Sequence, residues 1–252
     1  MLTTKNLPGS PIWLDLGSPD LPATVAFYTE LFGWSHHTME GADYGSFQQD
    51  GKTVAAVGKL TEEGAGPAWI VYFRSTDAHA GAKAVEQAGG AVRMVPQEIG
   101  PDGWIAQFSD PAGAQFAIWQ PVGGSGLELV TEPGSLCWAE LYTPSAEDAR
   151  AFYRSVFDWS FEDMAMGGMN YTVVTPPGGG ADDSMAGIVP MPGVPPHWLP
   201  YFEVRDCDAA VAKAQALGGA VALAAESVEG VGRFATLTDP HGVRFAVMTS
   251  SG

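Results

Sequence analysis

The order of apolar and polar residues predicts short strands separated by amphipathic helices. The stretch PIWLDLG (11–17) is short and mostly apolar, which predicts a strand. Leu21, Val25, Tyr28 and Phe32 then recur at helical spacing, so we expect a helix that turns these four side chains toward the core. Two strands and a further strand–helix segment follow.

Punctuating residues support these boundaries. Asp20 and Asp77 stand where the N-caps of the first two helices are expected, and Ser145 holds the same place before a third. Asp50-Gly51 lies between two strand-like runs and predicts a hairpin turn. Asp110-Pro111-Ala112-Gly113 predicts another turn between the last two strands of the first half.

The pattern then starts again, which divides the chain into two homologous halves. VAFYTELFGW (25–34) recurs as RAFYRSVFDW (150–159), and DPAGAQFA (110–117) recurs as DPHGVRFA (239–246). Each half reads as two βαβββ units, so the four units predict an α+β fold with a cupped mixed sheet in each half. The predicted boundaries are a first domain 8–121, a linker 122–133 and a second domain 134–250.

This order of elements, with the FY and FGW helix motif and the closing DP-x-G turn, resembles the vicinal oxygen chelate superfamily. That group contains glyoxalases, bleomycin resistance proteins and extradiol dioxygenases. The resemblance implies that paired βαβββ units form a cup around a site. It also implies four metal-binding positions per cup, in the first and last strand of each unit, which usually hold His, Gln or Glu.

The residues at those positions are not metal ligands. In the first half the positions hold Trp13, Ile70, Ala117 and a residue near Ala56, and in the second half Trp138, Leu199, Ala246 and a residue near Gly187. A divalent metal needs converging His, Cys or carboxylate donors. We therefore expect no family-type metal and no cofactor.

Strand alternation adds the residues two positions further on to the same face. These are Asp15, Tyr72 and Trp119 in the first cup, and Glu140, Tyr201 and Met248 in the second. Such a lining predicts binding of a small, largely apolar aromatic molecule. Asp15 and Glu140 are the candidate acid–base residues. The alternative is that these aromatics are packed core, and that a bulge turns both acids outward.

The composition and charge of the chain limit the classes of molecule that it is expected to bind. The 252-residue chain has a formal net charge of −17, which disfavours nucleic acid and anionic membranes. Two cysteines make no disulfide framework, and the first residues do not resemble a signal peptide, so we expect a cytoplasmic protein. Because the four units already supply both cups, either a monomer or a homodimer is compatible with the sequence.

Three functions remain open from the sequence. The first is metal-independent binding of a drug or secondary metabolite, for resistance or as a pathway accessory. The second is an enzyme of the glyoxalase or dioxygenase type, which uses Asp15 or Glu140 as acid or base, or depends on a metal after all. In the third, one cup is degenerate and only braces the other. Whether the chain is an enzyme therefore stays undecided at this point.

Overall fold

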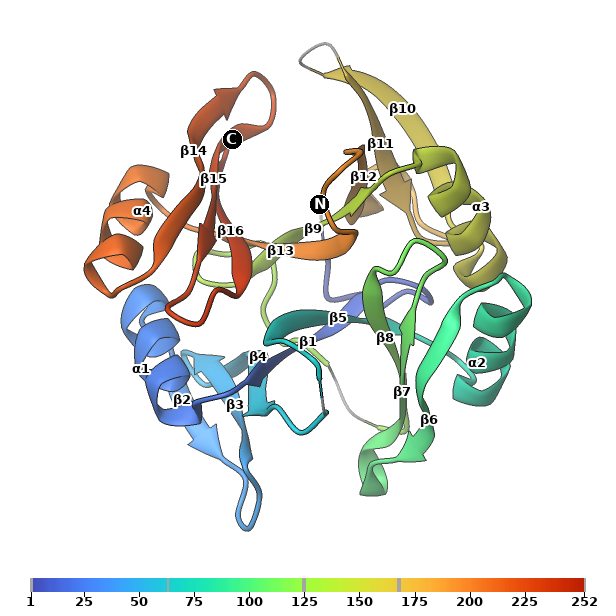
Figure 1. Cartoon of the computed structure of the whole chain (residues 1–252), viewed down its shortest axis with the longest axis horizontal. Helices are drawn as coiled ribbons and strands as arrows, with labels where there is room; N and C mark the ends of the chain where they lie inside the picture. Colours follow the sequence, from blue (N-terminus) through green and yellow to red (C-terminus); the bar gives the residue numbers. More distant parts are fainter. Residues whose placement is uncertain (1, 63, 124–125, 167–168, 252) are drawn as a thin grey trace. The chain divides into compact units, whose positions relative to one another are not determined.

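The computed structural model describes residues 2–62, 64–123, 126–166 and 169–251, and these form two sheets of eight strands each. The first sheet has the order β2-β3-β4-β1-β5-β8-β7-β6, and the second has the order β10-β11-β12-β9-β13-β16-β15-β14 (Figure 1). In the first sheet the parallel pairs β1–β4 and β5–β8 lie toward the centre, and antiparallel pairs such as β3–β4 and β7–β8 lie toward the two edges. The predicted α+β fold with two tandem mixed sheets is confirmed.

The first repeat supplies the first sheet. Its elements are β1 (Pro11–Ser18), α1 (Leu21–Phe32), β2 (Ser35–Thr38), β3 (Tyr44–Gln49), β4 (Lys52–Lys59), β5 (Ala68–Arg74), α2 (Ala78–Gln87), β6 (Ala91–Glu98), β7 (Gly103–Ser109) and β8 (Gln115–Pro121).

The second repeat supplies the second sheet in the same order. Its elements are β9 (Leu136–Thr143), α3 (Ala146–Phe157), β10 (Ser160–Met166), β11 (Met169–Thr175), β12 (Ala186–Pro190), β13 (His197–Glu203), α4 (Cys207–Ala216), β14 (Ala220–Val228), β15 (Gly232–Thr238) and β16 (Arg244–Ser250).

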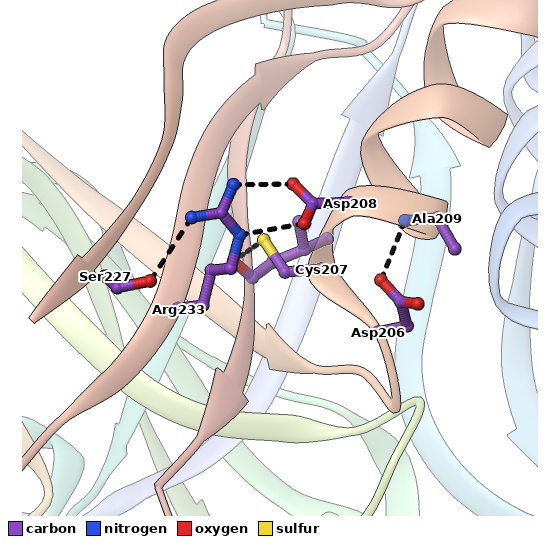
Figure 2. Close-up of polar contacts among 7 residues, drawn as sticks. Asp206, Cys207, Asp208, Ala209, Ser227 and Arg233 are labelled. Carbon is purple, nitrogen blue, oxygen red and sulfur yellow. Dashed lines mark hydrogen bonds and ion pairs between the residues drawn. The ribbon is translucent and has the colours of Figure 1, made fainter.

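The helices begin at the predicted caps. The side chains of Asp20, Asp77 and Ser145 each accept a hydrogen bond from a backbone N–H in the first turn of the helix that follows. Asp206 caps α4 in the same way, through the N–H of Ala209 (Figure 2). No helix among the described residues is long and apolar enough to span a bilayer.

The buried face of α1 differs from the predicted one. The helix buries Thr24, Phe27, Tyr28 and Leu31, whereas Leu21, Val25 and Phe32 are only partly buried. Residues three and four apart share a helix face, so several overlapping stripes fit this apolar-rich sequence. Only Tyr28 belongs to both the predicted and the observed stripe.

The chain forms two compact units, and each combines pieces of both repeats. The first unit contains Met1–Trp13, Ile70–Gly126 and Trp138–Trp198, and the second contains Leu14–Trp69, Leu127–Cys137 and Leu199–Gly252. In the first unit α2 packs against α3 (Figure 1), and in the second α1 packs against α4. The domain boundaries 8–121 and 134–250 stay a prediction, because the sheets follow the repeats whereas the units combine them.

Within the first unit, a helix tyrosine of one repeat binds a turn aspartate of the other. Tyr153 of α3 donates its hydroxyl to Asp110 Oδ2 over 3.2 Å, and it accepts the indole N–H of Trp198 over 2.9 Å. Asp110 Oδ1 accepts three backbone N–H groups of its own DP-x-G turn. The recurring FY and DP-x-G motifs thus meet, together with Trp198, in one buried hydrogen-bonded network.

The second unit repeats this network with the roles of the repeats exchanged. Tyr28 of α1 donates to Asp239 Oδ2 over 3.4 Å, and Trp69 donates to the Tyr28 hydroxyl over 3.1 Å. Burial, followed by the neighbouring carboxylate, raises the pKa of Tyr28 and Tyr153 well above the ordinary value of 10.0. Both phenols therefore stay protonated and act as donors at neutral pH.

We expect Tyr153→Phe to destabilise the protein by about 1–3 kcal/mol, because Asp110 Oδ2 and the Trp198 indole each lose a buried partner. Tyr28→Phe is the matched variant of the other network, whose hydrogen bonds are longer, so its loss should be smaller. Chemical denaturation measures both. Equal stability of wild type and Tyr153→Phe would contradict a stabilising network.

The same networks predict a pH dependence. Burial is the main cause that raises the pKa of Asp110 and Asp239 above the ordinary 3.8, so the folded state holds these protons more tightly than the unfolded state does. The stability that they contribute is therefore full below pH 3.8 and is lost as the pH rises through the folded-state pKa. Denaturation between about pH 4 and about pH 7 should show a smaller fall for Asp110→Asn than for wild type. An exposed change, Glu147→Gln, should leave the wild-type fall in place, and identical curves for all three proteins would refute the assignment.

Candidate functional site

On the side that the helices cover, each sheet makes side-chain contacts with a helix. On the helix side, Arg233 of β15 forms a bidentate ion pair with Asp208 in the first turn of α4 and also donates to Ser227 (Figure 2). The first repeat holds His79 and Trp104 at the corresponding positions, with ring centroids 5.0 Å apart. The residues that follow, Phe234 and Ile105, therefore point to the opposite face, which is the predicted cup face.

Cys207 lies beside this ion pair but has no reactive character. Its thiol faces the carbonyl oxygen of Val247, with 3.9 Å between sulfur and oxygen, and burial raises its pKa to about 11 (Figure 2). A thiol with a raised pKa is protonated at neutral pH and is a poor nucleophile.

Five predicted residues of the first cup lie together in one apolar cluster of the first unit. They are Trp13, Ile70, Tyr72, Ala117 and Trp119. Strand register explains the grouping, because Tyr72 of β5 and Gln107 of β7 both lie opposite Ala117 of β8. Ile12, Ile99 and Ile105 complete the cluster.

The cluster has a buried part and an open part. Tyr72 is 3% exposed and Trp119 7% exposed, whereas Trp13 and Ile70 are only partly buried. The rings of Trp13 and Trp119 meet edge to face at 5.4 Å, and the Trp119 indole N–H donates to the carbonyl of Asp102. Gln107 Nε2 donates to the Tyr72 hydroxyl over 3.3 Å, which places one polar group within the apolar face.

Asp15 belongs to the second compact unit, unlike the other predicted residues of the first cup. It is half-buried on β1 and lies opposite Ala56 of β4 in parallel register. The structure thus gives the position of Asp15 on its strand, and its role as an acid or base stays a prediction.

In the second repeat, Trp138 and Glu140 lie in a hydrogen-bonded network with two tyrosines. Tyr171 of β11 donates to Glu140 Oε1, and Tyr142 of β9 donates to Glu140 Oε2, each over 2.8 Å. The indole N–H of Trp138 donates to the Tyr171 hydroxyl, also over 2.8 Å. The ring of Tyr142 stacks on His197, with centroids 5.0 Å apart and planes 6° apart.

The direction of the hydrogen bond between Tyr171 and Glu140 follows from the pKa of the phenol. Burial, followed by the charge of Glu140, raises the pKa of Tyr171 well above 10.0, so its hydroxyl stays a donor. Both carboxylate oxygens of Glu140 thus accept a phenol O–H. Glu140 is 9% exposed, so the structure holds an oriented carboxyl group at the sheet face with little exposure to solvent.

The other predicted residues of the second cup lie in the second compact unit. Leu199 and Tyr201 are buried on β13, and Ala246 and Met248 are buried on β16. Tyr201 lies opposite Ala246 in parallel register, and its ring meets that of Phe234 at 6.0 Å. Register and strand alternation therefore place these four side chains on one face of the second sheet.

The residues at the family's ligand positions do not fit a divalent metal. Ala56 and Gly187 lie opposite Asp15 and Glu140, and neither can donate to a metal through its side chain. Within the described parts of the chain, no three His, Cys, Asp or Glu side chains are grouped as a metal would need. Beside Gly187, the Tyr171 hydroxyl lies 1.9 Å from where a Cβ would be, so a phenol takes the space of a longer side chain.

Three residues of this network were not predicted. Tyr142 follows Glu140 by two positions and His197 precedes Leu199 by two, so alternation carried one step further would have found both. Tyr171 could not be found in this way, because it lies on β11, a different strand, and the register of that strand is known only from the structure. Three of the five histidines, His36, His79 and His197, pack on aromatic rings.

Comparison with known proteins finds one family model and several relatives that match nearly the whole chain. A family model described as "Glyoxalase/Bleomycin resistance protein/Dioxygenase superfamily" matches residues 12–118 and 135–247. "Anthracycline biosynthesis protein DauV" of Streptomyces sp. (strain C5) is 39% identical over 97% of this chain and 94% of its own length. "Putative glyoxylase CFP32" of Mycobacterium bovis is 38% identical over 95% and 94%, respectively.

A solved structure shows the same fold at low sequence identity. The Mn(II)-bound glyoxalase from Novosphingobium aromaticivorans has a TM-score of 0.66 and 18% identity, with 96% of this chain and 82% of that chain covered. At this identity the likeness extends to the fold alone.

We expect Gly187→Ala to displace the Tyr171 ring and so to break its bonds to Glu140 and Trp138, at a cost of about 1–3 kcal/mol. Denaturation followed by tryptophan fluorescence measures the loss. Gly180→Ala, whose added Cβ meets only Asp183 at 3.9 Å, is the control. In a protein that already carries Tyr171→Ala, Gly187→Ala should cost much less stability than it does in wild type. If the two losses in free energy of unfolding simply add in the double variant, this packing is contradicted.

Proposed function

The chain belongs to the Glyoxalase/Bleomycin resistance protein/Dioxygenase superfamily, and we propose that it binds a small, largely apolar aromatic molecule without the help of a metal ion. Its role would be sequestration of a drug or secondary metabolite, or escort of an intermediate within a biosynthetic pathway. The protein would do this without a cofactor.

The apolar cluster of the first unit carries this proposal. It offers two tryptophans and a tyrosine on one sheet face, and Trp13 and Ile70 keep exposed surface there. A flat aromatic guest gains apolar burial and an offset or edge-to-face ring contact on such a surface. The Tyr72–Gln107 pair would orient one polar substituent of the guest.

The side chains at the family's metal-ligand positions support the proposal that binding needs no metal ion. The positions that the family uses for metal ligands hold Trp, Ala, Gly, Ile and Leu in this chain. The one buried carboxylate of the Trp138–Tyr171 network already accepts two phenol hydroxyls, which hold it at a fixed position without an ion. We therefore assign no step to a metal.

The relatives support a connection with secondary metabolism. Two proteins of Streptomyces that are named for anthracycline biosynthesis, DauV and DnrV, match this chain at 39% and 38% identity over 97% of its length. The apolar cluster around Trp13, Tyr72 and Trp119 would accommodate a ligand with fused aromatic rings. The charge of −17 argues against a nucleic acid or an anionic membrane as partner.

The alternative is a metal-free acid–base enzyme. One observation favours it: Glu140 is a buried carboxylate that two phenols orient, and an oriented carboxylate with little solvent is suited to take a proton from a bound substrate. Asp15 is the other candidate base. Mass spectrometry of an aromatic ketone incubated with the protein shows whether the ketone is converted to a product. If Glu140→Gln still binds the ketone but no longer converts it, the protein is an enzyme and not only a binding protein.

Calorimetric titration of dihydroxyanthraquinone into chelator-treated protein tests the binding proposal. We expect saturable binding, and Trp13→Ala should weaken it by about tenfold because an open stacking surface is lost. Trp104→Ala removes an indole from the helix side of the same sheet and should leave affinity within about twofold.

Elemental analysis of the purified protein completes this test. We expect no stoichiometric Zn, Ni, Fe or Mn, and unchanged affinity after any of these is added. Binding that appears only with a divalent metal would overturn the proposal, as would equal losses in Trp13→Ala and Trp104→Ala.

A further inference from the structure

The strand β14 lies at one edge of the second sheet. In the described parts of the chain it pairs with β15 alone, so one side of its backbone has no strand beside it (Figure 1). Its first five residues are exposed, and residues 220–225 read AVALAA, without charge or proline. A row of unpaired backbone N–H and C=O groups next to apolar side chains is a template for the addition of another strand.

The other sheet edges have features that prevent such pairing. The strand β2 is only four residues long, and β10 carries Glu162 and Asp163. The strand β6 takes the place of β14 in the first repeat and carries Arg93, Pro96 and Glu98. Short length, charge and proline are the usual protection of an edge strand. Of the four edge strands in the described residues, β14 alone begins with six uncharged residues.

The two equivalent edge strands also differ in how far their apolar side chains are covered. Val92 and Met94 of β6 are half-buried. Val221 and Leu223 hold the same positions on β14, and both are exposed. The register of each strand against its neighbour shifts at corresponding positions, so backbone irregularity does not account for the difference. The second sheet therefore leaves apolar edge surface open that the first sheet covers.

A second copy of this chain fits this edge. Antiparallel pairing about a two-fold axis at Leu223 places Ala222 opposite Ala224 of the partner subunit. It also places Ala220 opposite the partner subunit's Glu226, so no like charges meet across the axis. The net charge of −17 disfavours contact between copies elsewhere on the surface, and an uncharged strand is where contact costs least. Because the same strand serves both copies, the contact closes at two subunits.

From these observations we propose that the protein forms a homodimer in which the β14 strands of two copies pair antiparallel and make their second sheets continuous. The proposal concerns a protein surface and does not depend on ligand binding. Specific interfaces commonly bury roughly 1,200–2,000 Å², whereas this one is built mainly on a single nine-residue strand. We therefore expect a dimer that dissociates on dilution.

Sedimentation velocity of the full chain over a range of concentrations tests the dimer. We expect the dimer fraction of wild type to rise with concentration. Leu223→Lys puts two ammonium groups side by side at the axis and should weaken association at least about tenfold. Val95→Lys adds the same charge at an even more exposed apolar residue of β6, and it should leave the dissociation constant within about twofold of wild type.

Opposite charges give a test that a folding defect cannot imitate. Leu223→Glu should also weaken self-association, because two carboxylates then meet at the axis. An equimolar mixture of Leu223→Lys and Leu223→Glu should recover the dimer, since the introduced ammonium then lies opposite the introduced carboxylate. In wild type, the backbone amides of residues 220–226 should exchange hydrogen more slowly at high protein concentration, whereas those of β6 should not change.

The outcomes decide between β14 and any other surface. Wild type that stays monomeric at every concentration overturns the proposal and leaves this edge to a different kind of partner. Equal weakening by Leu223→Lys and Val95→Lys also overturns it, because association then depends on overall charge or on another interface. A charge-paired mixture that does not associate, or exchange at residues 220–226 that is independent of concentration, contradicts pairing through β14.

Discussion

The buried hydrogen bond from a helix tyrosine to a turn aspartate joins parts of the chain that are far apart in sequence. In one compact unit it joins Tyr153 to Asp110, and in the other it joins Tyr28 to Asp239. Each bond connects one repeat to the other, and each compact unit accordingly contains segments of both repeats. The FY and DP-x-G motifs are therefore structural, and their repetition reflects a packing requirement that the fold meets twice.

Local sequence patterns sufficed for most of the fold. Caps, turns and strand alternation depend on neighbours along the chain, and the helices do begin after Asp20, Asp77 and Ser145. The buried face of α1 was predicted only in part, because an apolar-rich helix offers several stripes and tertiary packing selects among them. Only part of the network around Glu140 could be predicted, because Tyr171 reaches Glu140 from another strand, β11, whose register the sequence does not give.

The two repeats show how one sheet geometry can support different chemistry. In the first, Trp13 and its neighbours make an apolar face that also contains the hydrogen bond between Gln107 and Tyr72. In the second, two phenols orient a carboxylate at the sheet face, and the phenol of Tyr171 takes the space beside Gly187. Among the described residues, neither face groups the His, Cys, Asp or Glu side chains that a divalent metal needs.

The most direct test of this account is a crystal structure of the protein with bound dihydroxyanthraquinone, with diffraction recorded at the absorption edges of Zn, Fe, Ni and Mn. The account predicts density for the fused rings against Trp13 and Ile70, and no anomalous peak. An anomalous peak beside the bound ligand, or a ligand that lies away from Trp13, would contradict it.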